Sequence, residues 1–352
     1  MLSPLAKAAA VITASLSLLT SVHAASTCNG SPDLCSRSFG NVTFVGSHDS
    51  YAIGLNNLAT NQDQNITTQL DNGIRMLQIQ THNQSGTIQL CHTSCGLYNG
   101  GTLQTYLTTV KSWLDANPND VLSLLIVNND NFLPPAYDSV FKAVGLDSMA
   151  YAPSSASLTT DKWPTLGTLI DSSKRLLTFM DYNADFTSVP YIIDEFSNIW
   201  ETAYDVTTSF DCAVNRSKGD TSTSMYLINH FLDTVLLGSP VPDPGDADKT
   251  NAVSGTNSLG AQVQLCASQY SRNPNFMLVD FYEYGGGSVF QVAATANGVQ
   301  YNPSTPIASP SSTSSSSSSG SGSGSSNGAG KLQWSTGLVI ISSVFLGALS
   351  VF

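Results

Sequence analysis

The stretch Val42-Thr43-Phe44-Val45-Gly46-Ser47-His48-Asp49-Ser50 decides how this chain is interpreted, because a short apolar run of strand character leads directly into a histidine. A second run, Thr87-Ile88-Gln89-Leu90-Cys91, leads into His92 in the same way. Imidazole titrates near neutral pH, so a pair of histidines can act as general base and general acid. A structural role for each histidine is the alternative, and placement at a strand end favours the functional interpretation.

Strand-like and helix-like segments alternate through the middle of the chain. Apolar and β-branched runs predict strands at 42–45, 76–80, 87–91, 121–127, 176–180, 225–228 and 276–280. Helical patterns lie between them, at 63–72, 103–117, 137–144, 165–172, 190–200, 258–270 and 288–295. This alternation indicates an α/β fold with a helix-covered parallel sheet, either a barrel or a doubly wound sheet. Neither a Gly-x-Gly-x-x-Gly motif nor a P-loop follows the first strand, which disfavours nucleotide binding.

The first 24 residues have the order of a secretory signal peptide. Lys7 supplies a positive charge, residues 8–19 form a short apolar stretch, and Val22-His23-Ala24 matches a cleavage site. An even number of cysteines, six, is typical of disulfide-bonded secreted chains. Sequons for N-glycosylation agree with the same route and lie at Asn29, Asn41, Asn65, Asn83 and Asn215.

The C-terminal region has the order of a GPI-attachment signal. A serine- and glycine-rich stretch at 309–326 is followed by small residues at 326–329, a polar spacer and an apolar tail at 337–352. A membrane helix is the alternative, but the tail is interrupted by serines and shorter than the roughly 20 residues of a span. We therefore expect a signal peptide at 1–24, one barrel domain at 26–302, a tether at 303–327 and a removed propeptide at 328–352.

The spacing of the cysteines favours local disulfides. Cys28 and Cys35 are close in sequence, as are Cys91 and Cys95, which would leave the remaining pair, Cys212 and Cys266. Six cysteines allow fifteen connectivities, so the pairing stays open at this level, and the spacing does not match a zinc site.

The chain is acidic, with a formal net charge of −12. Removal of Lys7 and Lys331 with the two processed ends leaves 11 basic residues against 25 acidic ones. Such a surface repels phosphate backbones, so we expect no nucleic-acid partner and no strong attraction to anionic bilayers. We expect a monomer.

Polar side chains follow several predicted strands. In a barrel the carboxyl ends of the strands form the active site, which places His48, Asp49, His92 and Asp280 at one mouth. The first and last strands of a closed barrel are neighbours, so Asp280 could orient His48; a turn-capping role is its alternative. Asn229 and Tyr282 are candidate pocket residues, for which structural roles remain the alternative.

Four segments together resemble the X region of phosphatidylinositol-specific phospholipases C, and most closely its secreted fungal group. They are Gly46-Ser47-His48-Asp49-Ser50, Leu70-Asp71-Asn72-Gly73-Ile74-Arg75-Met76-Leu77, Leu90-Cys91-His92 and Leu278-Val279-Asp280-Phe281-Tyr282. The resemblance implies a single, distorted TIM-type barrel that cleaves phosphodiesters outside the cell. It further implies that His48 is the general base, Asp280 its orienting carboxylate and His92 the general acid, with a cyclic inositol phosphate as product.

The second strand departs from the patterns of this family. Gln78 and Gln80 stand where metal-dependent members have acidic ligands, and Asp49 resembles the metal-independent branch, so we expect no metal ion and no cofactor. Bacterial members place a phosphate-stabilising arginine at the position of Gln80, which makes Gln80 and His82 the candidate substrate-binding residues here. Arg75, at the start of this strand, would face the opposite end of the barrel.

Three functions are therefore compatible with the sequence. The first is a GPI-anchored, metal-independent phosphodiesterase acting on a phospholipid or another phosphodiester head group. The second is a catalytically weakened relative that uses the barrel as a cell-surface binding module. The third, a metal-dependent glycerophospho- or sphingo-phosphodiesterase, is disfavoured by the two glutamines.

Overall fold

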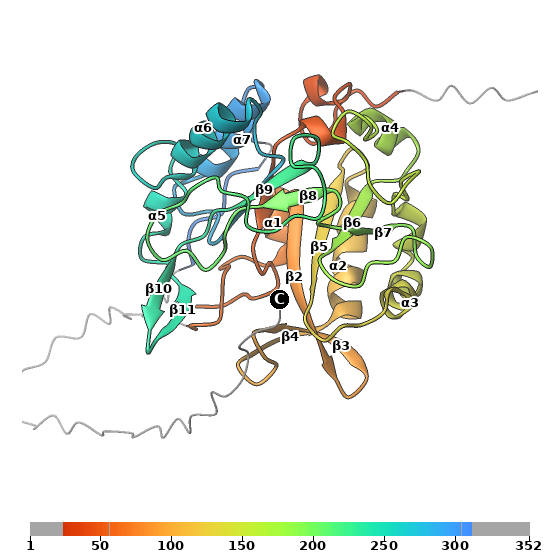
Figure 1. The fold of residues 1–352 in the computed structure, drawn as a ribbon, viewed down its shortest axis with the longest axis horizontal. Helices are drawn as coiled ribbons and strands as arrows, with labels where there is room; N and C mark the ends of the chain where they lie inside the picture. Colours follow the sequence, from red (N-terminus) through yellow and green to blue (C-terminus); the bar gives the residue numbers. More distant parts are fainter. Residues whose placement is uncertain (1–23, 56, 304, 312–352) are drawn as a thin grey trace, which may run out of the picture. The chain divides into compact units, whose positions relative to one another are not determined.

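The computed structural model of the protein describes residues 24–55, 57–303 and 305–311 (Figure 1). The predicted attachment signal and all but the last residue of the predicted signal peptide lie outside these ranges.

Eight parallel strands form the central sheet, in the order β7-β6-β5-β2-β1-β12-β9-β8. This order follows the chain around a ring in which the first strand lies beside the last, which is the arrangement of a (β/α) barrel and not of a doubly wound sheet. Within the described residues β7 and β8 are not hydrogen-bonded to each other, so the barrel is open there. The eight strands are β1 (Phe44–Ser47), β2 (Met76–Gln84), β5 (Leu122–Asn128), β6 (Leu176–Met180), β7 (Ile192–Asp194), β8 (Ile199–Glu201), β9 (Met225–Asn229) and β12 (Phe276–Val279).

Helices cover the outer face of the sheet (Figure 1). Most predicted helices are present, with bounds that move by one to three residues. They are α1 (Ile66–Asn72), α2 (Leu103–Ala116), α3 (Pro134–Val144), α4 (Leu166–Asp171), α6 (Leu259–Tyr270) and α7 (Ser288–Asn297), with a short α5 (Ala247–Thr250) that was not predicted.

The helix predicted at 190–200 is wrong, because this segment forms β7, a turn and β8. Both short strands are buried on both faces, and a continuous apolar run does not distinguish a buried strand from a helix. The backbone N–H of Ser197 donates to Asp194 Oδ1 at 2.8 Å, which closes the turn between the two strands.

Two antiparallel extensions project from the carboxyl-end side of the sheet. β2 continues past the barrel and pairs with β3 (Thr87–His92), which in turn pairs with β4 (Tyr98–Thr102). A separate hairpin, formed by β10 (Asp233–Leu236) and β11 (Ser239–Pro242), follows β9 and was not predicted. Both extensions lie toward the lower side of Figure 1, whereas α6 and α7 lie toward its upper side.

The barrel interior is filled by large apolar side chains, and a second apolar layer lies between the sheet and the helices. Gly46 belongs to the interior, where a Cβ would come within 3.0 Å of Leu278 and 3.1 Å of Met76. The side chains of Trp113, Trp163 and Trp200 are all buried. Disulfides join Cys28 to Cys35, Cys91 to Cys95 and Cys212 to Cys266, which confirms the pairing favoured by the spacing.

Residues 305–311, which the sequence assigns to the tether, form a strap along α1. Near the end of α1, the Thr305 hydroxyl donates to the Asp71 carbonyl at 2.8 Å. Near its start, the backbone N–H of Ser311 donates to Asp63 Oδ2 at 3.0 Å. The strap therefore runs from the amino-end side to the carboxyl-end side of the barrel, and the folded domain extends at least to Ser311.

Several carboxyl groups are buried in or beside the barrel. Burial raises the pKa of Asp181 to about 6 and that of Glu283 to about 7, and it raises the pKa of Glu195 and Glu201 as well. Arg216 forms an ion pair with Glu201. Both oxygens of Glu283 are buried without a hydrogen-bond partner among the described residues, so this carboxyl is best accommodated in its protonated form.

We predict that the stability of the fold decreases as the pH rises from 6.5 to 8.5. A raised carboxyl pKa means that the folded state holds protons that the unfolded chain has already released, so the free energy of unfolding falls through the folded pKa. The midpoint of thermal unfolding should be lower at pH 8.5 than at pH 6.5. Glu283→Gln should reduce this difference, whereas Asp161→Asn, at an exposed position, should leave it unchanged. A midpoint that rises over this interval would contradict the assignment.

Candidate active site

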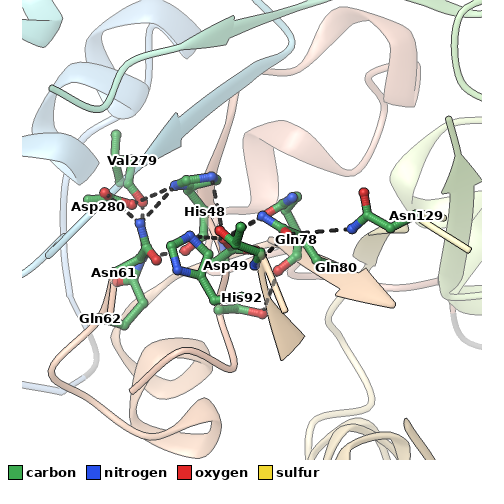
Figure 2. Close-up of polar contacts among 12 residues, drawn as sticks. His48, Asp49, Asn61, Gln62, Gln78, Gln80, His92, Asn129, Val279 and Asp280 are labelled. Carbon is green, nitrogen blue, oxygen red and sulfur yellow. Dashed lines mark hydrogen bonds and ion pairs between the residues drawn. The ribbon is translucent and has the colours of Figure 1, made fainter. Parts of the chain in front are cut away.

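The pairing of β1 with β12 brings His48 against Asp280. Ser47 is paired with Val279, and the backbone N–H of His48 donates to the Val279 carbonyl at 3.0 Å. His48 and Asp280 directly follow these two strand ends, and His48 Nδ1 lies 2.9 Å from Asp280 Oδ1 (Figure 2). The carboxylate accepts from Nδ1–H, which leaves Nε2 as the atom of His48 that can take a proton.

The loop after β1 supports this pair with two amide side chains that sequence analysis missed. Asn61 Nδ2 donates to Asp280 Oδ2 at 2.9 Å and lies 3.2 Å from His48 Nδ1. Gln62 Nε2 donates to the carbonyls of His48 and Val279, at 2.8 and 3.1 Å (Figure 2). These contacts hold the ends of β1 and β12 together. A loop amide carries no periodic signal, so the sequence alone did not identify either residue.

Phe231, directly after β9, packs flat on the imidazole of His48. The ring centroids are 3.7 Å apart and the rings are nearly parallel, at 3°. Together with the Asp280 hydrogen bond, this stacking fixes the plane of the imidazole. Nothing in the sequence marks Phe231, because its role depends on a neighbour far away in the chain.

His92 reaches the same mouth from the β2–β3 extension. It is the last residue of β3, it pairs with Tyr98 of β4, and the Cys91–Cys95 disulfide closes the loop around it. His92 Nε2 lies 3.2 Å from Asp49 Oδ2, and His48 Nε2 lies 3.7 Å from the same oxygen. The two imidazoles therefore face each other across one carboxylate oxygen (Figure 2).

Asp49 is held in place by Gln78 and Gln80 of β2. Its backbone N–H donates to Gln78 Oε1 at 2.5 Å, and Gln80 Nε2 donates to its Oδ2 at 2.8 Å. Asp49 has a positive φ of 38°, a conformation that is uncommon for a residue other than glycine and that clusters at functional sites. Gln80 was expected to bind substrate, but its amide is used to position Asp49.

Burial and charge separate the pKa values of these groups. Burial disfavours the charged imidazole of His48, but Asp280 and Asp49 outweigh this effect and raise its pKa to about 9. Burial raises the pKa of Asp49 to about 7. Burial, with the charge of His48, lowers the pKa of His92 to about 4. Near neutral pH the unliganded site thus has a charged His48, a neutral His92 and an Asp49 that is partly protonated.

The other predicted pocket residues lie outside this cluster. His82 lies on the β2–β3 extension, where its Nε2 lies 3.1 Å from Asn129 Nδ2 and its Nδ1 lies 3.6 Å from Asp130 Oδ1, just after β5. Asn229 is buried, and its side-chain amide donates to the Thr202 carbonyl at 2.9 Å. We assign Asn229 a structural role.

Tyr282 does not line the mouth, and its assignment as a substrate-binding residue is corrected here. It is fully buried, its hydroxyl donates to Asn72 Oδ1 at 2.8 Å, and its ring meets Phe290 edge-on. The reason is the turn after β12, where Phe281 has a φ of 43°, so that the following side chain packs between α1 and α7.

Arg75 contacts Asp120 and the Leu70 carbonyl at the amino end of β2, away from the mouth as expected.

Arg216 is a cation near the mouth that sequence analysis did not find. It lies in the long connection between β8 and β9, where Nε pairs with Glu201 and the guanidinium lies over the rings of Phe196 and Tyr204, at 5.0 and 4.7 Å. Glu201 is the last residue of β8, so this ion pair holds Arg216 at the carboxyl-end side of the sheet.

The described residues contain neither a cluster of metal ligands nor a helix that could span a membrane. In that part of the chain, no group of three or more His, Cys, Asp or Glu side chains is arranged so that it could bind a metal ion. Across residues 24–55, 57–303 and 305–311, no helix has the length and apolar character needed to cross a membrane.

Comparisons with known proteins agree with this architecture. An "Uncharacterized secreted protein" of Arthroderma benhamiae is 46% identical over 286 residues, which are 78% of this chain but only 65% of that protein. The "PI-PLC X domain-containing protein 1" of the same organism is 44% identical over 277 residues, covering 77% of this chain and 90% of the relative. The phosphatidylinositol-specific phospholipase C from Listeria monocytogenes superposes with a TM-score of 0.51 at 14% identity, over 77% of this chain and 98% of that one.

The bacterial likeness supports the barrel fold alone, because the sequence identity is low. The family comparison covers more: the model of the PI-PLC X family (PI-PLC X 1) matches residues 34–297 and so includes every strand of the barrel and all four clustered side chains. The protein belongs to the PI-PLC X domain family.

Proposed function

We propose that the protein is an extracellular, metal-independent phosphodiesterase of the phospholipase C type. The observation that carries this proposal is the convergence of His48, Asp280, His92 and Asp49 at the carboxyl ends of the strands. Two imidazoles with opposed Nε2 atoms, one oriented by a carboxylate, provide a base and an acid on either side of a reacting phosphorus.

The reaction can be written with the atoms that the site supplies. The neutral form of His48, which a pKa of about 9 makes the minor form near neutral pH, takes the proton of a substrate hydroxyl next to the phosphate at Nε2, and the hydroxyl oxygen forms a bond to phosphorus. The bond from phosphorus to the alcohol oxygen of the lipid breaks, and His92 protonates that oxygen. Asp280 stabilises the imidazolium formed on His48, and the product is a cyclic phosphodiester.

The proton needed by the leaving group can be stored between Asp49 and His92. Their closest atoms are 3.2 Å apart, and the pKa of Asp49 is raised to about 7, so the pair holds a proton in part of the molecules near neutral pH. A phosphate placed beside His92 favours the charged imidazole and raises its pKa from the low value of the unliganded site. Substrate binding would thus move the proton onto His92.

Charge on the phosphate requires a cation, and the position of Gln80 provides none. His48 becomes one source once Nε2 has taken the proton of the hydroxyl. Arg216 is another, because the ion pair with Glu201 and the rings of Phe196 and Tyr204 fix its guanidinium beside the mouth. We assign Arg216 to the phosphate or to the head group attached to it.

A second function deserves a test, that of a cell-surface binding module with weakened catalysis. It is favoured by the unliganded site itself, in which Asp49 Oδ2 contacts both imidazoles and the amide of Gln80. A phosphate entering this space must compete with that carboxylate.

We place the protein outside the cell, held at the membrane by a GPI anchor as a monomer. Support comes from the sequence order at both ends, from three disulfides and from a relative that is named as a secreted protein. The substrate is then a phospholipid or another phosphodiester with a hydroxyl next to the phosphate.

We predict that His48→Gln, His92→Gln and Asp280→Asn each lower the turnover of phosphatidylinositol by about 10²–10⁴-fold, because each removes a proton-transfer or orienting group. Release of diacylglycerol by the purified protein is the measurement, with thermal unfolding as a check of folding. Asp115→Asn, the same change as in Asp280 but on the outer surface of α2, serves as control and should retain full turnover. Wild-type turnover in the His48 and His92 variants would overturn the mechanism.

We predict that chelation of divalent cations leaves this turnover unchanged, because Gln78 and Gln80 offer amides where carboxylate ligands would be required. The assay is repeated after treatment with a chelator and again after addition of calcium or magnesium. Loss of turnover that is restored by either ion would show that the proposal is incorrect on this point.

We predict that the mature chain runs from Ala25 or Ser26 to near Asn327 and ends in a glycolipid. Mass spectrometry of the terminal peptides of the native protein is the measurement. Recovery of a mature peptide ending at Phe352 would exclude the anchor.

A further inference from the structure

The two histidines of the site are held in different ways. His48 is fixed through its side chain, because Asp280 bonds its Nδ1 at 2.9 Å and Phe231 stacks on its ring. The imidazole of His92 lacks such support, since its Nδ1 is buried and has no hydrogen-bond partner among the described residues. Its Nε2 contacts Asp49 Oδ2 at 3.2 Å, but a substrate has to replace this contact. The position of the His92 ring therefore depends on the backbone that carries it.

That backbone lies outside the barrel. His92 is the last residue of β3, which pairs only with the extended part of β2 and with β4. The next strand, β4, begins at Tyr98, so residues 93–97 belong to no helix or strand. His48, by contrast, follows a strand that is paired on both sides within the barrel. The general acid thus stands at the start of an irregular loop, whereas the general base stands at the end of a central strand.

The loop turns sharply directly after His92. Thr93 has a positive φ of 59°, a conformation that is unfavourable for a β-branched residue. The backbone N–H of Ser94 donates back to the His92 carbonyl at 2.6 Å, which closes the turn. Backbone strain of this kind persists only where the surrounding structure holds it. Some constraint must therefore keep this turn in place.

The Cys91–Cys95 disulfide provides that constraint. It spans four positions of the sequence with a Cα–Cα distance of 4.8 Å, and the ring that it closes encloses residues 92–94. A ring this small leaves few conformations open to the backbone inside it. Cys91 is buried and pairs with Asn99 of β4, which connects the ring to the sheet. The disulfide is therefore the covalent element that fixes where His92 stands.

We propose that the Cys91–Cys95 disulfide is a positioning device for the general acid, which holds the backbone of His92 so that Nε2 faces the departing alcohol oxygen. The two cysteines are positioning residues that act through His92. The inference rests on the proposed function for the role of His92, and it assigns the disulfide to one step, the protonation of the leaving group. Without the cross-link the proton is not delivered, and the alcohol has to leave as an alkoxide.

The nature of the leaving group separates this role from a general loss of stability. Two water-soluble inositol phosphodiesters are compared, one that releases a simple alkyl alcohol and one that releases 4-nitrophenol. An alkoxide requires the proton of a general acid, whereas nitrophenolate leaves without it. Cys91→Ala/Cys95→Ala, which we call the loop variant, should lower kcat by about 10²-fold on the alkyl substrate and by less than about threefold on the nitrophenyl substrate. Adding His92→Gln to the loop variant should cause little further loss, because the acid is already displaced.

The Cys28–Cys35 disulfide offers a matched control. It is also local, with a sequence separation of seven, and one of its cysteines is likewise buried. It lies at the opposite end of the barrel, where Asn29 bonds the backbone of Val121 just before β5. Cys28→Ala/Cys35→Ala, the control variant, should retain the turnover of both substrates. All variants are assayed below their own midpoints of thermal unfolding, so that unfolding does not contribute.

A second measurement tests the position of His92 without any turnover. The ring faces His48 and Asp49, and burial together with the charge of His48 lowers the pKa of His92 to about 4. Titration of the imidazole by NMR, with the signal assigned through His92→Gln, should give this low pKa in the wild type and in the control variant. In the loop variant the pKa should rise toward the ordinary value of about 6.5, because the ring leaves the buried site.

Three outcomes would overturn the positioning role. They are a His92 pKa that is the same in the wild type and the loop variant, an equal loss of turnover on the two substrates, and equal losses in the loop and control variants. Failure of the proposed function gives a different result: a wild type that turns over neither substrate, with a low His92 pKa that rises in the loop variant, would support the positioning role and reject the enzymatic activity.

Discussion

The parallel pairing of β1 with β12 is the contact on which the site depends. It joins two strands more than two hundred residues apart, and its register sets Ser47 opposite Val279. The two side chains that follow, those of His48 and Asp280, consequently meet at hydrogen-bond distance. A slip of one residue would turn one of them to the opposite face of the sheet. Asn61 and Gln62 bind both strand ends, so the loop after β1 protects this register.

The cost of the site is an accumulation of negative charge. Asp49, Asp233 and Asp280 surround one imidazole, and the pKa values of Asp49 and Asp233 are each raised to about 7, chiefly by burial. These carboxyls make His48 strongly basic and leave His92 without a positive charge in the unliganded protein. The raised pKa values of these carboxyls lower the stability of the fold at higher pH, but they also provide groups that can exchange protons near neutral pH.

The loops and extensions, and not the barrel strands, carry several of the residues at the mouth. The opening between β7 and β8 is followed by the connection that carries Arg216, and the β2–β3 extension delivers His92. The β10–β11 hairpin links an exposed leucine to the ring that stacks on His48. The sheet thus holds His48, Asp49 and Asp280, while the surrounding segments frame the entrance to the mouth.

The sequence by itself determined the class of fold and most of the strands and helices, because these depend on local periodicity. It also indicated the disulfide candidates through cysteine spacing, and the histidine–aspartate set through motif segments that occur in a fixed order along the chain. It did not distinguish the buried strands at 192–201 from a helix, since burial on both faces removes the periodic signal. Only the tertiary structure decided the roles of Asn61, Phe231 and Arg216, whose partners are distant in the chain. It also moved Tyr282 into the core, because a single left-handed residue, Phe281, sets the direction of the side chain that follows.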